Sequence, residues 1–196
     1  MKYLQKSSYL LSLLLLSAVA QAGQWLVNNE QSQLSFVSTK KVNIAEVHHF
    51  GQLAGGLSES GQFSLDIDLA SVDTGIEIRD SRMREFLFNI VEFPKARITA
   101  EVDSVVIDAL EVAQSTTMTI EGELSLHGQS QPLTSEVLVT RISDSELLVV
   151  SAKPIILSVA DYELVQGVEK LRELAGLPSI SHAVPVSFYL TLNAAN

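Results

Sequence analysis

Residues 62–69 alternate strictly between polar and apolar side chains, in the order Gln-Phe-Ser-Leu-Asp-Ile-Asp-Leu. Successive side chains of a β-strand point to opposite faces of its sheet, so this segment presents one apolar face and one polar face. We expect the apolar set to be buried and the polar set to be exposed, namely Phe63, Leu65, Ile67 and Leu69 against Ser64, Asp66 and Asp68. The pattern therefore predicts a strand with a core on one side only.

The same period of two recurs along most of the chain. It is clear at residues 97–103, 117–127 and 184–192, and weaker at 25–27, 33–38, 133–142 and 146–152. A parallel sheet would need a helix between most of its strands, and only two helical segments are visible. The sequence therefore predicts an all-β fold, a single antiparallel β-barrel of about eight strands with two short helical inserts.

The two inserts space their apolar residues by three or four positions, as amphipathic helices do. They cover residues 80–90 and 161–175. We expect Asp80 and Asp161 to cap the starts of these helices, because a carboxylate accepts hydrogen bonds from the free backbone N–H groups there. Pro94 follows the first helix, and Gly176 with Pro178 follows the second, where each ends a helix.

Alternation alone does not say which face of a barrel is inside, since an outer-membrane barrel carries its apolar face outward. The strands here lack aromatic girdles and the second insert is amphipathic, which favours a water-soluble barrel with an apolar interior. An eight-stranded barrel is wide enough either to be filled by side chains or to hold one small ligand. Gly122 lies on the inward face, where a glycine leaves room or marks a bend in the sheet.

The N-terminal residues have the organisation of a secretory signal peptide. Residues 1–6 carry two lysines and no acid, residues 10–19 are almost wholly apolar, and Ala20 and Ala22 flank Gln21. The apolar run is shorter than the roughly 20 residues that a transmembrane helix needs. We expect cleavage after Ala22, with residues 23–196 forming one domain in the periplasm and no stable membrane insertion.

The formal net charge is −10 and the chain has no cysteine. An acidic surface repels the phosphate backbone of nucleic acids, so nucleic-acid binding is disfavoured. Secreted domains often use disulfides to support a small core. This chain must rely on packing alone.

An ordered set of short motifs resembles the YceI-like family of polyisoprenoid-binding proteins. Ser-Val-Asp-Thr-Gly at 71–75 precedes Arg79-Asp80, a Phe-bearing helix and Phe93-Pro94, and Gly-Glu-Leu-Ser-Leu-His-Gly stands at 122–128. A third block, residues 163–185, resembles a subgroup with a helix before the last strand. The resemblance runs from Trp25 to Leu192.

The resemblance implies a lipocalin-like barrel that holds a long isoprenoid, such as a quinone or a polyprenyl phosphate, or another lipid-like amphiphile. The sequence departs from the family in its first hairpin. Thr-Lys-Lys at 39–41 stands where the family often has a Lys-His pair, and Val-His-His-Phe-Gly at 47–51 stands near its Gly-x-Phe.

Few residues have the arrangement of a reactive site. His48 and His49 are adjacent on a strand and would point to opposite faces, and no third ligand stands at zinc-like spacing. We expect His127 to hydrogen-bond local backbone. No Gly-x-Ser-x-Gly motif occurs. We therefore expect no catalytic residue, no metal and no other cofactor.

Arg79, Arg82 and Arg84 form a basic cluster in an acidic chain. Guanidinium groups suit phosphate, so this cluster could meet an anionic headgroup. The alternative is solvated surface, as in most charge runs.

Three classes of function remain: a carrier or store for an amphiphile, a non-catalytic interaction module with a packed barrel, and an enzyme acting on a lipid. We expect the first, with an isoprenoid-like or other lipid as the partner. The ligand-binding residues that we expect are Phe63, Leu65, Ile67, Phe86, Phe88, Met118, Ile120, Gly122, Leu124, Phe188, Arg82 and Arg84.

Overall fold

The alternating segments form strands in the computed structural model, which describes residues 25–195. The predicted signal peptide, residues 1–22, lies outside the described residues. In chain order the strands are β1 (Trp25–Val27), β2 (Gln33–Lys40), β3 (Ile44–Phe50), β4 (Leu53–Leu57), β5 (Gln62–Asp68), β6 (Val72–Asp73), β7 (Lys95–Glu101), β8 (Ser115–Leu126), β9 (Gln129–Ser143), β10 (Glu146–Ser151), β11 (Ile155–Ser158) and β12 (Ala183–Ala194).

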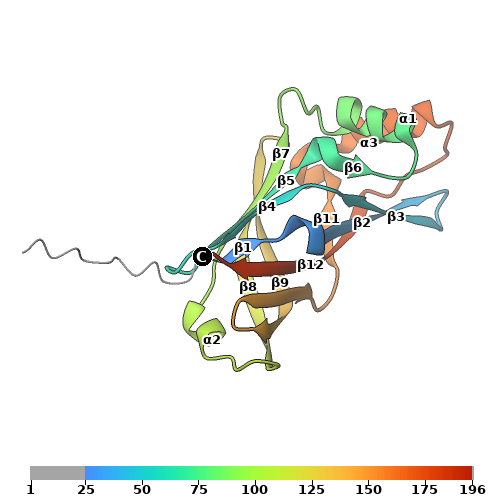
Figure 1. Ribbon diagram of the computed structural model, residues 1–196. Coiled ribbons are helices and arrows are strands. Elements are labelled where there is room, and N and C mark those ends of the chain that lie inside the picture. Colours follow the sequence, from blue (N-terminus) through green and yellow to red (C-terminus); the bar gives the residue numbers. More distant parts are fainter. Residues whose placement is uncertain (1–24, 196) are drawn as a thin grey trace, which may run out of the picture.

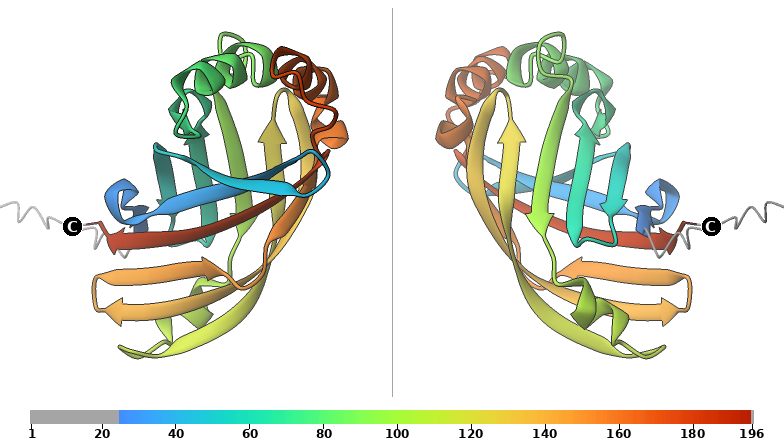
Figure 2. Two further views of the ribbon diagram at one scale, coloured as in Figure 1. Left: turned by 90° about the vertical axis from the view of Figure 1, so that its right-hand side faces the viewer. Right: turned by 90° about the vertical axis from the view of Figure 1, so that its left-hand side faces the viewer.

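The helices are α1 (Glu77–Arg82), which continues into the π-helical turn η3 (Met83–Leu87), α2 (Ser104–Asp108) and α3 (Val165–Leu174). Three short 3₁₀ turns complete the list: η1 (Asn29–Gln31), η2 (Leu69–Ser71) and η4 (Val159–Tyr162). In Figures 1 and 2, α1 and α3 lie side by side over one end of the sheet, and α2 lies near the opposite end.

The sheet closes into an eight-stranded antiparallel barrel, as the sequence predicts. Strands β1, β4, β5, β7, β8, β9, β10 and β12 are hydrogen-bonded in that order, and β1 also pairs with β12. The remaining strands extend this ring at the end that carries α1 and α3. There β12 pairs with β2 on one side and with β11 on the other, and β3 lies between β2 and β6.

The residue patterns in the sequence do not predict four of the strands or one of the helices, namely β3, β4, β6, β11 and α2. In β3 the inward positions include Glu46 and His48, so the apolar alternation is interrupted. In β4 two glycines, Gly55 and Gly56, leave positions without a side chain. Strand β11 has the sequence Ile-Ile-Leu-Ser, so apolar residues lie on both of its faces.

On the inward face of β5, Leu65 and Ile67 are buried as predicted, whereas Phe63 is only partly buried, and the outward carboxylates are not freely solvated. Leu65 and Ile67 are 1% and 4% exposed. Asp66 is half-buried because Arg97 of β7 binds both of its carboxylate oxygens, at 2.5 and 2.9 Å, and this contact holds the pKa of Asp66 below its usual range. Asp68 accepts a hydrogen bond from the backbone N–H of Ala70 and so caps the turn η2.

Both predicted helix caps are wrong. The first helix begins at Glu77, three residues earlier than expected, so Asp80 lies inside the helix. Its carboxylate accepts a hydrogen bond from the backbone N–H of Thr74 in the preceding loop. The second begins at Val165, so the exposed Asp161 belongs to the turn η4 instead. Gly176 follows α3 with a φ of 61°, as the predicted end of that helix requires.

Gly122 marks a close approach between strands and leaves no open space at its Cα. A Cβ atom there would lie 2.3 Å from the carbonyl oxygen of Thr99 in β7. The glycine therefore allows β7 and β8 to come close together at this point.

The burial of β5 generates a paired prediction. Ile67→Asp places an unpaired charge in the core and should lower the free energy of unfolding by about 4 kcal/mol or more. Ser64→Asp adds the same side chain on the exposed face of the same strand and should change it by less than about 0.5 kcal/mol. Urea unfolding of the two variants checks this, and equal losses would contradict the register described here.

Candidate functional site

The barrel encloses two cavities. The larger, about 390 Å³, lies beneath α1, η3 and α3, and the smaller, about 90 Å³, lies deeper in the barrel. Ile98, Leu133 and Ile155 line both cavities and so separate them. Pockets of roughly 300–1,000 Å³ suit small molecules, so the larger of these two cavities has the size of a ligand site and the smaller does not.

The predicted binding residues divide between these spaces. The larger cavity is lined by Ile67, Phe88, Leu124 and Arg82. The smaller cavity is lined by Phe63, Leu65, Met118, Ile120, Gly122 and Phe188. Strand β8 explains much of this split, because its first half borders the small cavity and its last residues border the large one.

Phe86 and Arg84 line neither cavity, so the structure does not bring them together with the other predicted residues. Phe86 is exposed, and Arg84 forms an ion pair with Glu77 at 2.7 Å. The cause is the π-turn, in which the N–H of Phe88 donates to the carbonyl of Met83, five residues back. The wider turn shifts the helical phase, so that Met83 and Phe88 face inward.

Helix α3 forms the other part of the cover over the large cavity, with Leu164, Val168 and Leu171 on its wall. It packs directly on η3 through the buried Gly167. A Cβ atom at this position would lie 2.6 Å from the carbonyl oxygen of Phe86. The absence of a side chain therefore allows the two cover elements to make close contact.

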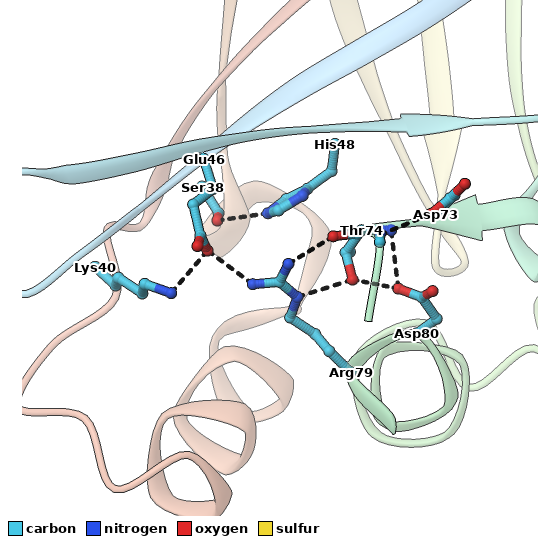
Figure 3. A network of polar contacts seen from close by, with 9 residues as sticks. Ser38, Lys40, Glu46, His48, Asp73, Thr74, Arg79 and Asp80 are labelled. Atoms are coloured by element: carbon cyan, nitrogen blue, oxygen red, sulfur yellow. Dashed lines mark hydrogen bonds and ion pairs between the residues drawn. The ribbon is translucent and has the colours of Figure 1, made fainter. Parts of the chain in front are cut away.

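One end of the large cavity is polar, and strands β2 and β3 and helix α1 build it (Figure 3). The residues are Ser38, Lys40, Glu46, His48 and Arg79. At its centre, one carboxylate oxygen of Glu46 accepts from the Lys40 ammonium at 2.8 Å and from the Arg79 guanidinium at 2.7 Å. The hydrogen bond from Lys40, and to a lesser extent the contact with Arg79, hold the pKa of Glu46 below its usual range, so the carboxylate stays charged.

The loop before α1 fixes the orientation of Arg79. Its Nε donates to the hydroxyl of Thr74 at 2.8 Å, and its Nη2 donates to the carbonyl of Thr74 at 2.7 Å. The Thr74 hydroxyl in turn donates to Asp80, which is buried. Figure 3 shows this chain of contacts running from α1 to Glu46. Arg79 is therefore held on both sides by groups of the protein.

His48 is 2% exposed and lies beside this ion pair. Its Nε2 is 3.0 Å from the hydroxyl oxygen of Ser38, and its ring packs edge-on against Phe36. Its Nδ1 has no hydrogen-bond partner within residues 25–195. Burial, and then the positive charge of Arg79, lower the pKa of His48, so the neutral imidazole is favoured.

The neighbouring histidines behave differently. His49 points to the other face of β3, as predicted, and lies 3.7 Å from Asp73. His127 corrects its prediction, because its Nδ1 lies 3.3 Å from the carbonyl oxygen of Tyr162, a residue 35 positions away rather than local. The side chain of Tyr162 lines the large cavity, and burial raises its pKa.

Reasoning from the sequence missed the polar end of the cavity. The sequence pattern does not bring Lys40, Glu46 and Arg79 together with His48, because Lys40, Glu46 and Arg79 come from separate segments of the chain. A usable signal was present: residues 44, 46, 48 and 50 share one face of β3, and that face ends in the buried Phe50. Every second residue of β3 still shares this face, but Glu46 and His48 make two of these positions polar and so interrupt the apolar pattern.

Within residues 25–195, no cluster of three or more His, Asp, Glu or Cys side chains is arranged to hold a metal ion. Over the same residues, none of the helices is long and apolar enough to cross a membrane.

The lowered pKa of His48 generates a prediction on pH. Below the usual histidine pKa of 6.5, the unfolded chain binds a proton that the folded chain resists. The free energy of unfolding should therefore fall as the pH drops below 6.5 toward the folded-state pKa. His48→Phe should remove this part of the pH dependence, as measured by urea unfolding across the range. An unchanged slope in the variant would contradict the assignment.

The chain is similar to several known proteins. The family model described as the YceI-like domain matches residues 25–192. A polyisoprenoid binding domain from Saccharophagus degradans, implicated in plant cell wall breakdown, is 37% identical, with a TM-score of 0.86 over 87% of this chain and 98% of that chain. BcnA from Burkholderia cenocepacia is 16% identical, with a TM-score of 0.65 over 84% of this chain and 98% of that one.

The YceI protein of Campylobacter jejuni is 11% identical, with a TM-score of 0.56 over 76% of this chain and 85% of that one. At these low identities, BcnA and the Campylobacter protein show a shared fold alone. Among curated proteins, none matches this chain. The family match covers nearly all of the described residues, and the motifs that resemble the family lie on the barrel and its cover. The chain belongs to the YceI-like family.

Proposed function

We propose that the protein binds an isoprenoid-like or similar lipid amphiphile inside the barrel and acts as its carrier or store, without catalysis. The observation that carries the proposal is the 390 Å³ cavity, which is walled by apolar side chains and has one polar end. An amphiphile has the matching division, with an apolar chain and a polar head. The similarity to a polyisoprenoid binding domain at 37% identity supports the same ligand class.

The chain would lie against the apolar wall beneath the cover. This wall draws on β5, β7, β8, η4 and α3, through residues that include Ile67, Ile98, Leu124, Val159 and Val168. Each CH₂ group buried there contributes roughly 0.8 kcal/mol before ordering costs. Affinity should therefore rise with chain length until the cavity is full.

A periplasmic location fits this function, and it rests on the N-terminal sequence. A carrier or store that works in the periplasm must first be exported from the cytoplasm. The predicted signal peptide, residues 1–22, supplies the export signal, and the chain has no cysteine to which a lipid anchor could be attached. Residues 23–196 would then form the mature barrel domain.

Export generates a simple prediction. Cells that express the full chain should release it with the periplasmic fraction, and N-terminal sequencing should begin at Gly23. Recovery of protein that retains residues 10–19, or recovery from membranes alone, would contradict the export step.

Binding is tested on two levels. A lipid extract of the purified protein, analysed by mass spectrometry, should contain an isoprenoid or related amphiphile. Delipidated protein should then bind a graded series of prenyl chains with affinity that rises with length. An empty barrel and an affinity independent of length would instead support an interaction module that acts through its surface.

A matched pair of variants tests whether the ligand lies in the cavity. Leu171→Trp adds bulk on the face of α3 that lines the cavity and should weaken long chains about tenfold while short chains are less affected. Lys170→Trp adds the same bulk at the exposed neighbouring position and should leave the length series unchanged. Titration of both variants with the same prenyl series is the measurement. Equal effects would place the ligand elsewhere.

A further inference from the structure

At the polar end of the cavity, two cations share the one carboxylate of Glu46, and one buried atom is left unsatisfied. Within residues 25–195, three buried side-chain atoms lack a hydrogen-bond partner: His48 Nδ1, Ser135 Oγ and Arg141 Nε. Of these residues, only His48 lines the large cavity. A buried polar atom without a partner is costly in a folded protein, and it often marks the place of a water or a ligand.

The state of His48 defines what it can bind. Burial and the nearby Arg79 favour the neutral ring, which has one N–H donor and one nitrogen acceptor. The Ser38 hydroxyl at Nε2 can either donate or accept. When Ser38 donates, Nδ1 carries the proton and can donate to a carbonyl oxygen. When Ser38 accepts, Nδ1 is free to accept from a hydroxyl group.

Building on the lipid-binding function above, we propose that His48 is a ligand-binding residue whose Nδ1 hydrogen-bonds an uncharged headgroup oxygen, a hydroxyl or a carbonyl. The polar end of the cavity thereby selects an uncharged head over a phosphorylated one.

Glu46 supplies the discrimination against phosphate. Its carboxylate lies on the same wall and already binds both cations of this cluster, Lys40 and Arg79. Arg79 has further contacts to Thr74. A phosphate placed here would have to compete with the Glu46 carboxylate for the same two cations, or lie beside that carboxylate and be repelled by it. An uncharged oxygen meets no such penalty.

A phosphate would find a different cation on the cavity wall. Arg82 lines the cavity and has no carboxylate within ion-pair distance among the described residues. It donates to the carbonyl of Leu174, the last residue of α3, at 3.4 Å. The two headgroup chemistries therefore depend on two different residues, His48 and Arg82.

Two ligands with one chain separate these sites: geranylgeraniol, an uncharged alcohol, and geranylgeranyl diphosphate. Wild-type protein should bind the alcohol more tightly. His48→Phe keeps a ring of similar size and should weaken the alcohol about tenfold, the effect of about one lost hydrogen bond, with the diphosphate changed by less than about twofold. Arg82→Gln should instead weaken the diphosphate, whose phosphates need the cation on this part of the cavity wall.

Two further variants test the atom rather than the ring. The side-chain amide of His48→Asn lies near the position of Nδ1 and should retain most of the affinity for the alcohol. That of His48→Gln lies near the position of Nε2 and should retain the contact to Ser38 but lose affinity for the alcohol as His48→Phe does. Thermal melting of each apo variant shows whether it is folded, and the Asn and Gln pair remains comparable even where His48→Phe is destabilised.

Other outcomes overturn the proposal in distinguishable ways. Tighter binding of the diphosphate, weakened by Arg82→Gln and not by the His48 variants, would place an anionic head at Arg82. Binding of both ligands with no effect of any His48 variant would make His48 a structural residue and leave lipid binding intact. Failure of the wild-type protein to bind either ligand, with no lipid in its extract, would remove the proposed function itself.

Discussion

The cavity depends on the closure of the barrel by the three residues of β1, which lie between β4 and β12. Trp25 pairs with Leu57 on one side and with Ala194 on the other. The contact with β4 is close, since a Cβ atom at Gly56 would lie 2.1 Å from the carbonyl oxygen of Trp25. Without this pairing the sheet would have two free edges, and the enclosed space would become an open groove.

Closure also explains how ionised groups are accommodated at the wall of an apolar space. Strands β2 and β3 extend the ring beneath the start of α1. Arg79 of α1 therefore contacts Glu46, which comes from a different segment of the chain. Charges taken out of water need partners, and Lys40, Glu46 and Arg79 supply them to one another. Among residues 25–195, the neutral His48 is the group at this end of the cavity with an unsatisfied buried atom, Nδ1.

The cover over the cavity rests on two local irregularities. The π-turn of η3 rotates Phe88 inward, where it packs against Phe50 of β3 with ring centroids 5.8 Å apart. Gly167 then allows α3 to lie directly on the backbone of this turn. Regular helices with larger side chains would stand further apart, and the cavity would be more open at this end.

The sequence by itself determined the class of fold, because alternation at residues 62–69 and its repeats is a local property of each strand. It also determined the inward face of β5 and the end of α3 at Gly176. Only the tertiary structure decided which inward residues meet a ligand-sized space. Met118 and Phe188 are inward, yet they border the small cavity, since the size of each space depends on the strands that lie opposite and on the helices above. The polar end joins Ser38, Glu46 and Arg79 from three segments, and its polar residues weaken the very alternation that reveals a strand.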